Sequence, residues 1–407
     1  MPNGQWILGD LFEKDYGHAG SIKKLWDMRW RFPCSKGLYP FHDGKYEDFE
    51  PIFTHLIKND INDPYDDMYT DAFLPTAQDL TKQAEQMEGR DKEKAKSLYL
   101  RANAVLRLAR FPYIGTAAKE QVFEVQKQVY LRGSRLWDVP IEEVVIPHAY
   151  TGPHDGKDIP LYLRVPTYAS KERKAPTVLL ITGLDGHRPD NTERTNEHLK
   201  RGWATIICDI PGTTVDCPAD KRDPLASDRL FSSILEWIKD EGRFDETKVL
   251  AWGLSAGGYY AIRLAHTHRE LLQGVVGHGV GTHHYIGREW LERVGKHEYP
   301  FGLERAYVNK YGYKDFEEVK ERCQREFSLV SGEGEGVAVV GQGMKSCRLL
   351  LINGVLDGCM PVEDSMLLAE YGSPKEMRFI KERFHMGYPE ANSVVYPWME
   401  SIIEAPI

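Results

Sequence analysis

The chain has 407 residues, of which 42% are hydrophobic and 28% charged, and its formal net charge is -9. This composition is typical of a soluble globular protein and excludes disorder over long spans. The negative charge, without any run of lysine and arginine, argues against nucleic acid or an anionic membrane as the main partner.

The cysteines and the N-terminal residues bear on the compartment. Six cysteines are scattered without a C-x-x-C pair, which favours a reducing compartment over a disulfide framework. The first residues lack the basic and apolar regions of a secretory signal, and no stretch approaches the roughly 20 apolar residues that span a bilayer. We therefore expect a soluble, cytoplasmic protein.

The first third of the chain predicts a helical domain. Residues 1–73 are rich in Trp, Tyr, Phe and Pro, which indicates a packed segment that wraps around something larger. From Thr76 to Ala109 apolar residues recur every three or four positions, as on an amphipathic helical face, and a second helical stretch follows at 119–130. We assign residues 1–140 to an N-terminal helical cap domain.

At Ile141 the pattern changes from helical to extended. A pair of strands is predicted first, then continuous apolar runs of the kind found in strands buried on both faces of a parallel sheet. The predicted strands lie at 142–150, 159–166, 176–182, 203–212, 249–252, 271–281, 346–357 and 376–380. Because helical patterns alternate with these strands, residues 141–407 predict an α/β fold with a mainly parallel sheet.

One long interruption, residues 282–343, separates two of these strands. Its pattern is helical and partly aromatic. Insertions at this point emerge at the carboxyl edge of a sheet, where ligands bind. We expect this helical insertion to contribute to a lid or a pocket wall.

The sequence Gly253-Leu254-Ser255-Ala256-Gly257 lies between an apolar strand and a predicted helix. A G-x-S-x-G turn in that context holds a serine in a strained backbone conformation, and the glycines leave room for it. Ser255 is therefore the candidate nucleophile. The alternative is an ordinary glycine-rich turn, because so short a pattern also occurs by chance.

The positions of an acid and a histidine support this interpretation. In this architecture the catalytic order along the chain is Ser, then Asp or Glu, then His. Asp357 directly follows a predicted strand, and His385 is the only histidine after it. His385 would act as general base and Asp357 would orient it. Asp364 and Glu363 remain alternatives for the acid, and a capping or surface role remains one for His385.

Acyl transfer also needs N–H donors for the developing oxyanion. We expect these to be the backbone N–H groups of Ala256 and Leu184, with Asp185, His187 and Arg188 near the pocket entrance. For Asp185, a position at a helix N-terminus explains the residue equally well. The candidate substrate-binding residues are Asp185, His187, Tyr259, His283 and Tyr285.

The sequence gives only weak signals for a metal or cofactor site. His266, His268, His283 and His284 are close in sequence, but no H-E-x-x-H or Cys/His spacing supports zinc. The chain also lacks a phosphate-loop motif and a dinucleotide-binding motif. We expect no metal and no cofactor.

Several segments carry a resemblance to a known family. Residues 94–114, 181–190, 253–266, 352–358 and 384–388 resemble the α/β-hydrolases with a helical N-terminal domain. That group includes bacterial 2,6-dihydroxypseudooxynicotine hydrolase, which cleaves a carbon-carbon bond. The opening segment, residues 6–57, resembles the fungal yellowish-green heptaketide hydrolases of dihydroxynaphthalene-melanin synthesis.

This resemblance implies an α/β-hydrolase that shortens an aromatic polyketide. Relatives of this kind convert a heptaketide naphthopyrone to 1,3,6,8-tetrahydroxynaphthalene with release of acetoacetate, in pigment biosynthesis. The family triad falls on Ser255, Asp357 and His385. Aromatic residues of the cap would stack on the substrate, including Trp26, Trp30, Tyr39 and Tyr285.

Two other hypotheses remain at this stage. One is a carboxylesterase or acyl-peptidase with the same triad, and the other is an inactive hydrolase fold used as a small-molecule receptor. The sequence leaves the oligomeric state open, with a homodimer compatible, and leaves open a peripheral association of the soluble protein with endosomes.

Overall fold

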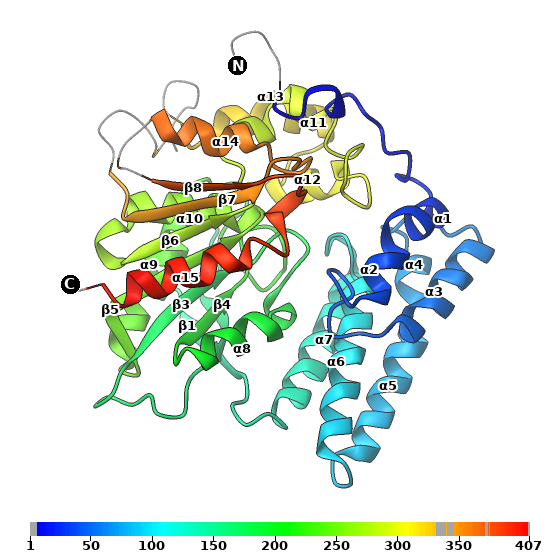
Figure 1. Ribbon diagram of the computed structural model, residues 1–407, viewed down its shortest axis with the longest axis horizontal. Coiled ribbons are helices and arrows are strands. Elements are labelled where there is room, and N and C mark those ends of the chain that lie inside the picture. The colour runs from blue at the N-terminus through cyan, green and yellow to red at the C-terminus, as the bar shows by residue number, and fades with distance from the viewer. Residues whose placement is uncertain (1–5, 331–338, 340–344, 371–372, 374, 406–407) are drawn as a thin grey trace.

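The computed structural model describes residues 6–330, 339, 345–370, 373 and 375–405. In this part of the chain, a domain built on a central sheet stands beside a domain of helices that comes from the N-terminal third (Figure 1). The two domains pack against each other through α6 and α7 of the helical domain.

The helical domain consists of α1 Ile22–Leu25, α2 Arg31–Ser35, α3 Tyr46–Lys58, α4 Asp67–Asp71, α5 Leu74–Met87, α6 Lys92–Ala109 and α7 Ala117–Ser134. The helical pattern of residues 76–109 is thus split between α5 and α6. Asp91 begins α6, because its side chain accepts the backbone N–H of Lys94. The prediction for 119–130 is confirmed, with the helix extended at both ends.

The core of this domain is aromatic. The ring of Trp26 stacks on Phe53 with 4.4 Å between centroids, and Trp30 packs edge-on against Phe41 at 5.4 Å. Only 2% of Trp26 and 4% of Trp30 is exposed. The predicted stacking of these two tryptophans on a substrate is therefore wrong, because neighbouring side chains of the domain already cover their rings.

The sheet has the strand order β1-β2-β4-β3-β5-β6-β7-β8. Its strands are β1 Glu142–Pro147, β2 Asp158–Arg164, β3 Ala175–Ile181, β4 Ala204–Cys208, β5 Phe244–Leu254, β6 Gly274–His278, β7 Arg348–Gly354 and β8 Glu376–Ile380. β2 pairs antiparallel with β1 and with β4, whereas β3 to β8 run parallel. The predicted mainly parallel sheet is confirmed.

Helices bury both faces of this sheet. Leu179 of β3 packs with α9 Ala226–Glu241 and α10 Ala256–Thr267, whereas its neighbour Val178 packs with α15 Asn392–Ile403 on the other face. α8 Thr192–Lys200 lies on the same face as α15 (Figure 1). Because side chains alternate along a strand, burial of both faces explains why these strands are continuously apolar.

The insertion after β6 contributes α11 Arg288–Leu291, α12 Glu304–Tyr311 and α13 Phe316–Phe327. Figure 1 shows it at the carboxyl edge of the sheet, near α14 Val362–Leu367. His297 fixes it there, since its ring nitrogens lie 3.1 Å from the Gly358 carbonyl and 2.7 Å from the Phe12 carbonyl. Residues 331–338 and 340–343 of the predicted insertion lie outside the described residues.

Asp190 joins the two domains. Its carboxylate accepts hydrogen bonds from Arg107 Nε and Gln126 Nε2, both at 2.9 Å, from Arg110, and from the backbone N–H of His187 at 2.8 Å. The two arginines come from α6 and its C-terminus and the glutamine from α7, while Asp190 follows β3. This buried network of hydrogen bonds and ion pairs ties the two domains together.

In the described part of the chain, no helix combines the length and the apolar character needed to cross a bilayer.

Candidate active site

Ser255 lies at the turn between β5 and α10 with φ 54° and ψ -122°, a strained conformation for a residue with a side chain. The flanking glycines permit this turn. A Cβ atom on Gly253 would lie 2.4 Å from the Gly257 carbonyl oxygen, and one on Gly257 would lie 2.2 Å from the Thr182 carbonyl oxygen. The G-x-S-x-G pattern therefore forms the sharp strand-to-helix turn that its spacing predicts.

The structure brings the three predicted triad residues together. Ser255 Oγ lies 2.8 Å from His385 Nε2, and His385 Nδ1 lies 2.7 Å from Asp357 Oδ2. The serine follows β5, the aspartate follows β7 and the histidine follows β8, so all three lie at the carboxyl edge of the sheet. The histidine side chain is 19% exposed and that of the aspartate is fully buried.

The loop after β7 holds the Asp357 carboxylate. Its Oδ1 accepts the backbone N–H groups of Cys359 and Met360 at 2.7 and 2.8 Å, and its Oδ2 accepts Asn353 Nδ2 at 2.6 Å. The Asn353 Oδ1 atom in turn accepts the backbone N–H of Met386 at 3.1 Å, which ties this loop to the histidine turn. These bonds orient the carboxylate so that Oδ2 points toward Nδ1 of His385.

The two alternative acids have other partners. The Asp364 carboxylate accepts four backbone N–H groups of residues 282–285, at 2.7 to 3.2 Å, and so shapes the start of the insertion. Glu363 accepts the backbone N–H of Ile7 at 2.5 Å. Of the three candidates, Asp357 is the one bonded to His385.

Sequence reasoning missed Glu298, which lies in the insertion. Its Oε1 accepts the backbone N–H groups of Gly358 at 2.9 Å and of His385 at 3.0 Å. Burial and the nearby charge of Asp357 raise the pKa of Glu298 to about 8. The predicted position of the insertion at the sheet edge indicated that this region lies near the site. No motif in its sequence, however, identified Glu298 as a functional residue.

The protonation of His385 depends on the same carboxylates. Burial by itself would lower the pKa of His385, but the charge and hydrogen bond of Asp357, followed by the charges of Glu298 and Asp185, outweigh it and raise the pKa. A base of this kind is strengthened for accepting the serine proton.

The predicted oxyanion donors flank the nucleophile. Ala256 is the first residue of α10, where backbone N–H groups have no partner within the helix. The loop with Leu184 lies close by, because a Cβ atom on Gly183 would be 3.5 Å from Ser255 Cβ. The two N–H groups are therefore on segments that meet at the serine.

Asp185 joins the cap, the insertion and the sheet. Its Oδ2 accepts the hydroxyl of Tyr299 at 2.8 Å, and the hydroxyl of Tyr39 also bonds to this carboxylate. Arg110 Nη1 donates to the Asp185 carbonyl at 2.8 Å. Since the charge of Asp185 acts on His385, the predicted position near the site holds, and the helix N-terminus explanation does not describe these contacts.

The predicted position of His187 and Arg188 at the pocket entrance is wrong. Both side chains are fully buried. Arg188 forms ion pairs with Asp209, whose Oδ2 lies 2.9 Å from the Arg188 Nε, and with Asp216. His187 packs against Phe123 with 5.2 Å between ring centroids.

Of the other predicted substrate-binding residues, Tyr259 lies on α10 and packs against Tyr285, and both side chains are only 3% exposed. Their ring centroids are 6.4 Å apart, and the Tyr285 hydroxyl lies 2.9 Å from that of Tyr311. His283 has a different place: its Nδ1 lies 2.8 Å from Ser328 Oγ and its Nε2 lies 3.3 Å from Gln324 Nε2.

Asp357, Cys359 and His385 hold ligand-type atoms within 4.8 Å of one another, the group of described residues best placed for a metal ion. Burial, however, raises the pKa of the Cys359 thiol well above its ordinary value, whereas a metal requires the thiolate. His385 Nδ1 is also bonded to Asp357. This donor set fits the triad better than a metal.

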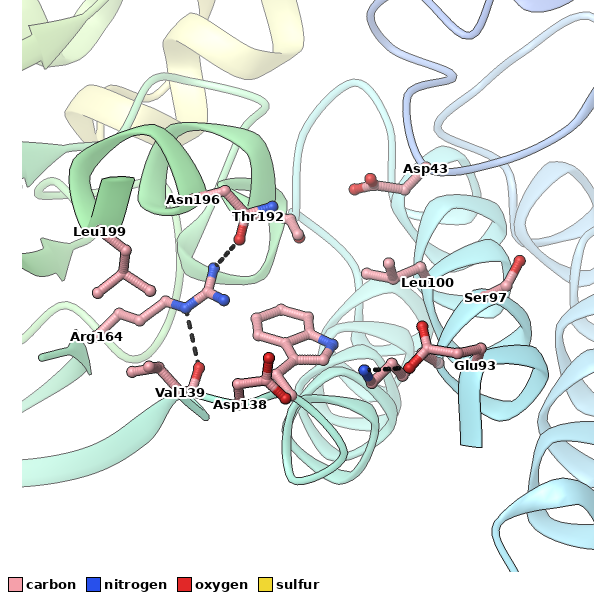
Figure 2. A pocket seen from close by; sticks show the side chains of 12 residues that line it. Asp43, Glu93, Ser97, Leu100, Asp138, Val139, Arg164, Thr192, Asn196 and Leu199 are labelled. Atoms are coloured by element: carbon pink, nitrogen blue, oxygen red, sulfur yellow. Dashed lines mark hydrogen bonds and ion pairs between the residues drawn. The ribbon is translucent and has the colours of Figure 1, made fainter. Parts of the chain in front are cut away.

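A separate cavity of about 520 Å³ opens between α6 and α8 (Figure 2). Arg164 lies in its wall, where it donates to the Val139 carbonyl at 3.1 Å and to Asn196 Oδ1 at 2.5 Å. The lining residues are Asp43, Glu93, Lys96, Ser97, Leu100, Trp137, Asp138, Val139, Arg164, Thr192, Asn196 and Leu199. None of them belongs to the triad.

The sequence of this chain matches a known protein family. The sequence model described as "Esterase FrsA-like" matches residues 72–297. Esterase FrsA of Pectobacterium atrosepticum is 24% identical over 203 residues, which cover 49% of this chain and 46% of that protein. Esterase FrsA of Citrobacter koseri is 22% identical over 248 residues, covering 57% of this chain and 58% of that protein. The chain thus matches about half the length of these relatives.

Solved structures support the fold. The crystal structure of 2,6-dihydroxy-pseudo-oxynicotine hydrolase matches with a TM-score of 0.66 and 16% identity, covering 82% of this chain and 88% of that one. AbyA5 matches with a TM-score of 0.62 and 16% identity, covering 81% and 89%. At this identity the likeness shows the fold alone, and it confirms the predicted α/β-hydrolase fold with an N-terminal helical region.

Proposed function

This chain belongs to the FrsA-like esterase family, and from this premise we propose that it is a serine hydrolase. Ser255 is the nucleophile, His385 the general base and Asp357 the group that orients the histidine. The observation that carries the proposal is the hydrogen-bonded series Asp357–His385–Ser255, at 2.7 and 2.8 Å, at a strained strand-to-helix turn.

For the substrate we propose an aromatic polyketide in which a carbon-carbon bond is cleaved, as in melanin synthesis. The resemblance of residues 6–57 to the fungal heptaketide hydrolases supports this class. Glu298 is our candidate for the proton source, because burial and the charge of Asp357 raise its pKa to about 8.

The reaction then follows from these roles. Ser255 attacks the side-chain ketone while His385 takes its proton, and the Leu184 and Ala256 N–H groups stabilise the oxyanion. Collapse breaks the carbon-carbon bond, and the leaving ring carbon takes the proton of Glu298. The proton that His385 accepted from Ser255 then passes to the Glu298 carboxylate, so that His385 is again a neutral base and Glu298 is again protonated. Water activated by His385 then hydrolyses the acyl-serine and releases acetoacetate, leaving 1,3,6,8-tetrahydroxynaphthalene as the aromatic product.

A second candidate is a carboxylesterase or acyl-peptidase that uses the same triad. The family match over residues 72–297 favours it, since the relatives there are named esterases. An ester has a better leaving group than a carbon and does not require a proton donor such as Glu298. An esterase would hydrolyse small p-nitrophenyl esters rapidly.

The deciding experiment incubates the purified protein, and its Ser255→Ala variant, with the heptaketide naphthopyrone and follows the products by mass. Serine-dependent formation of tetrahydroxynaphthalene and a four-carbon acid is the expected result. No conversion, together with rapid serine-dependent hydrolysis of small esters, would select the esterase. Equal activity of the Ser255→Ala variant would reject the nucleophile.

A further inference from the structure

Arg29 is a half-buried arginine that has no counter-ion among the described residues. Its Nη2 atom is buried and has no hydrogen-bond partner, and no carboxylate of the described residues pairs with the guanidinium. The buried arginines of the domain junction differ in this respect, since Arg107 and Arg110 share the Asp190 carboxylate. Because this half-buried guanidinium has one nitrogen withdrawn from water without a hydrogen-bond partner, an anion that paired with it would be stabilised.

Aromatic rings hold the guanidinium in place. Its carbon lies 4.3 Å from the ring centroid of Tyr16 and 5.8 Å from that of Phe384. Rings that contact the face of a guanidinium do not occupy its N–H edge, and that edge matches the two oxygens of a carboxylate. Arg29 also lies in a π-helical turn, Trp26–Trp30, a geometry that often occurs at functional sites.

Arg29 contacts the residue that precedes the triad histidine. Phe384 directly precedes His385 in the chain. The segment of Tyr16 packs on the segment of Glu298: the Tyr16 N–H donates to the Lys296 carbonyl at 3.1 Å. His18, two residues further, has its Nε2 2.8 Å from the Tyr299 carbonyl. Arg29 and Glu298 are therefore joined through the same short stretch of the insertion.

Two exposed apolar side chains are close to Arg29 in sequence, and a third, Phe384, contacts it. Met28 and Phe32, four residues apart on the Arg29 helix, are 61% and 68% exposed, and Phe384 is 39% exposed. A charge between apolar side chains suits a ligand that combines an aromatic body with an ionised oxygen.

We propose that Arg29 forms an anion-binding subsite beside His385 that takes a carboxylate, phenolate or enolate oxygen of an aromatic substrate. The subsite rests on the proposed function only in identifying the anion as part of the substrate. It selects acidic aromatic ketones or esters over their neutral counterparts, because a neutral group leaves the guanidinium unpaired.

Binding to the Ser255→Ala variant tests the subsite without turnover. The probes are 2-naphthoate and its neutral analogue 2-naphthamide, titrated by calorimetry. Adding Arg29→Gln should weaken 2-naphthoate about tenfold or more, as expected for a hydrogen bond to a charged group, and leave 2-naphthamide unchanged. Arg31→Gln, at an exposed arginine of the same helix, is the matched control and should change neither affinity.

The proposal is overturned if 2-naphthoate does not bind, if it binds equally without Arg29, or if the amide loses as much affinity as the acid. Should Arg29→Gln fail to fold, Arg29→Lys replaces it. The lysine keeps the positive charge but lacks the paired N–H donors of a guanidinium, so the preference for 2-naphthoate over 2-naphthamide should fall several-fold. An unchanged preference would reject the subsite. 1,3-Dihydroxynaphthalene, titrated above and below its ionisation, distinguishes a phenolate from a carboxylate site, and Arg29-dependent binding of either ion supports the proposal.

These outcomes are separate from those of the proposed function. Arg29-dependent binding of 2-naphthoate without any serine-dependent hydrolysis would reject the function and leave the subsite. Serine-dependent hydrolysis with equal use of acidic and neutral substrates by the wild type would reject the subsite and leave the function.

Discussion

The carboxyl group of Glu298 accepts the backbone N–H of His385, with 3.0 Å between Oε1 and the nitrogen. Burial and the charge of Asp357 raise the pKa of Glu298 to about 8. Burial lowers the pKa of His385, but Asp357 and Glu298 outweigh it and raise the pKa above its ordinary value. Because these carboxyl groups and the histidine interact, a pH profile reports apparent pKa values that belong to the three groups together rather than to one residue.

Carbon-carbon cleavage should therefore have a bell-shaped pH profile. The rate rises with pH as His385 loses its proton and becomes a base, and it falls as the pH passes about 8, where Glu298 loses the proton that the leaving carbon needs. Glu298→Gln should lower kcat for the ketone about 10²-fold or more and remove the alkaline limb. Hydrolysis of p-nitrophenyl acetate should change much less.

The control for this variant is Glu292→Gln, at an exposed glutamate of the same insertion. It should leave both activities unchanged. Equal losses by Glu298→Gln on the ketone and on the ester would contradict the role of proton donor and indicate a general disturbance of the His385 turn.

The nucleophile turn should not tolerate a side chain at Gly257. A Cβ atom there would lie 2.2 Å from the Thr182 carbonyl oxygen, which is backbone and cannot move aside. Gly257→Ala should lower the free energy of unfolding by about 1–3 kcal/mol, and the displaced serine should lower kcat about 10²-fold. Gly89→Ala, where a Cβ meets nothing within 4 Å, is the control for denaturant unfolding. Equal stability of the two variants would refute this account of the turn.

Asp190 should control the stability of the domain junction. Burial alone would raise the pKa of Asp190, but Arg110 and Arg107 hold it well below its ordinary value. A group with a lowered folded-state pKa stabilises the fold above its unfolded pKa, so the Tm should fall as the pH drops below about 4. Asp190→Asn should cost about 3–5 kcal/mol at neutral pH, because two buried arginines lose their partner.

The exposed Asp240 of α9 supplies the control, since Asp240→Asn should change the Tm little. Thermal unfolding followed at several pH values measures both effects. A Tm of Asp190→Asn close to that of wild type at pH 7 would show that the junction does not depend on this carboxylate.

The position of Trp26 in the core makes a prediction about folding rather than binding. Its ring stacks on Phe53 at 4.4 Å, so Trp26→Ala leaves a cavity and should cost about 3–5 kcal/mol. Val125→Ala, at a 46% exposed position of α7, should cost far less. Unfolding in urea measures both. A stable Trp26→Ala variant with weakened substrate binding would restore the predicted stacking role.

Local patterns and chain order were enough to predict the parallel strands, the nucleophile turn and the triad. Continuous apolar runs predicted the parallel strands, because side chains alternate and both faces are buried. Two glycines around Ser255 predicted the sharp turn, because only that conformation requires them at both positions. Asp357 and His385 could be predicted because their order after the last strands leaves few candidates.

The residues that surround this framework could not be predicted, because they depend on contacts between segments far apart in the chain. Glu298 reaches the His385 backbone across 87 positions of the chain, and no periodicity records such a contact. Trp26 and Tyr39 are both aromatic residues of the N-terminal segment. Trp26 is buried in the helical domain, whereas the hydroxyl of Tyr39 bonds to Asp185. Arg188 is buried because Asp209 pairs with it, whereas Arg29 has no such partner among the described residues. Whether a charge is paired depends on which segments the fold brings together, and a local pattern contains no information about that.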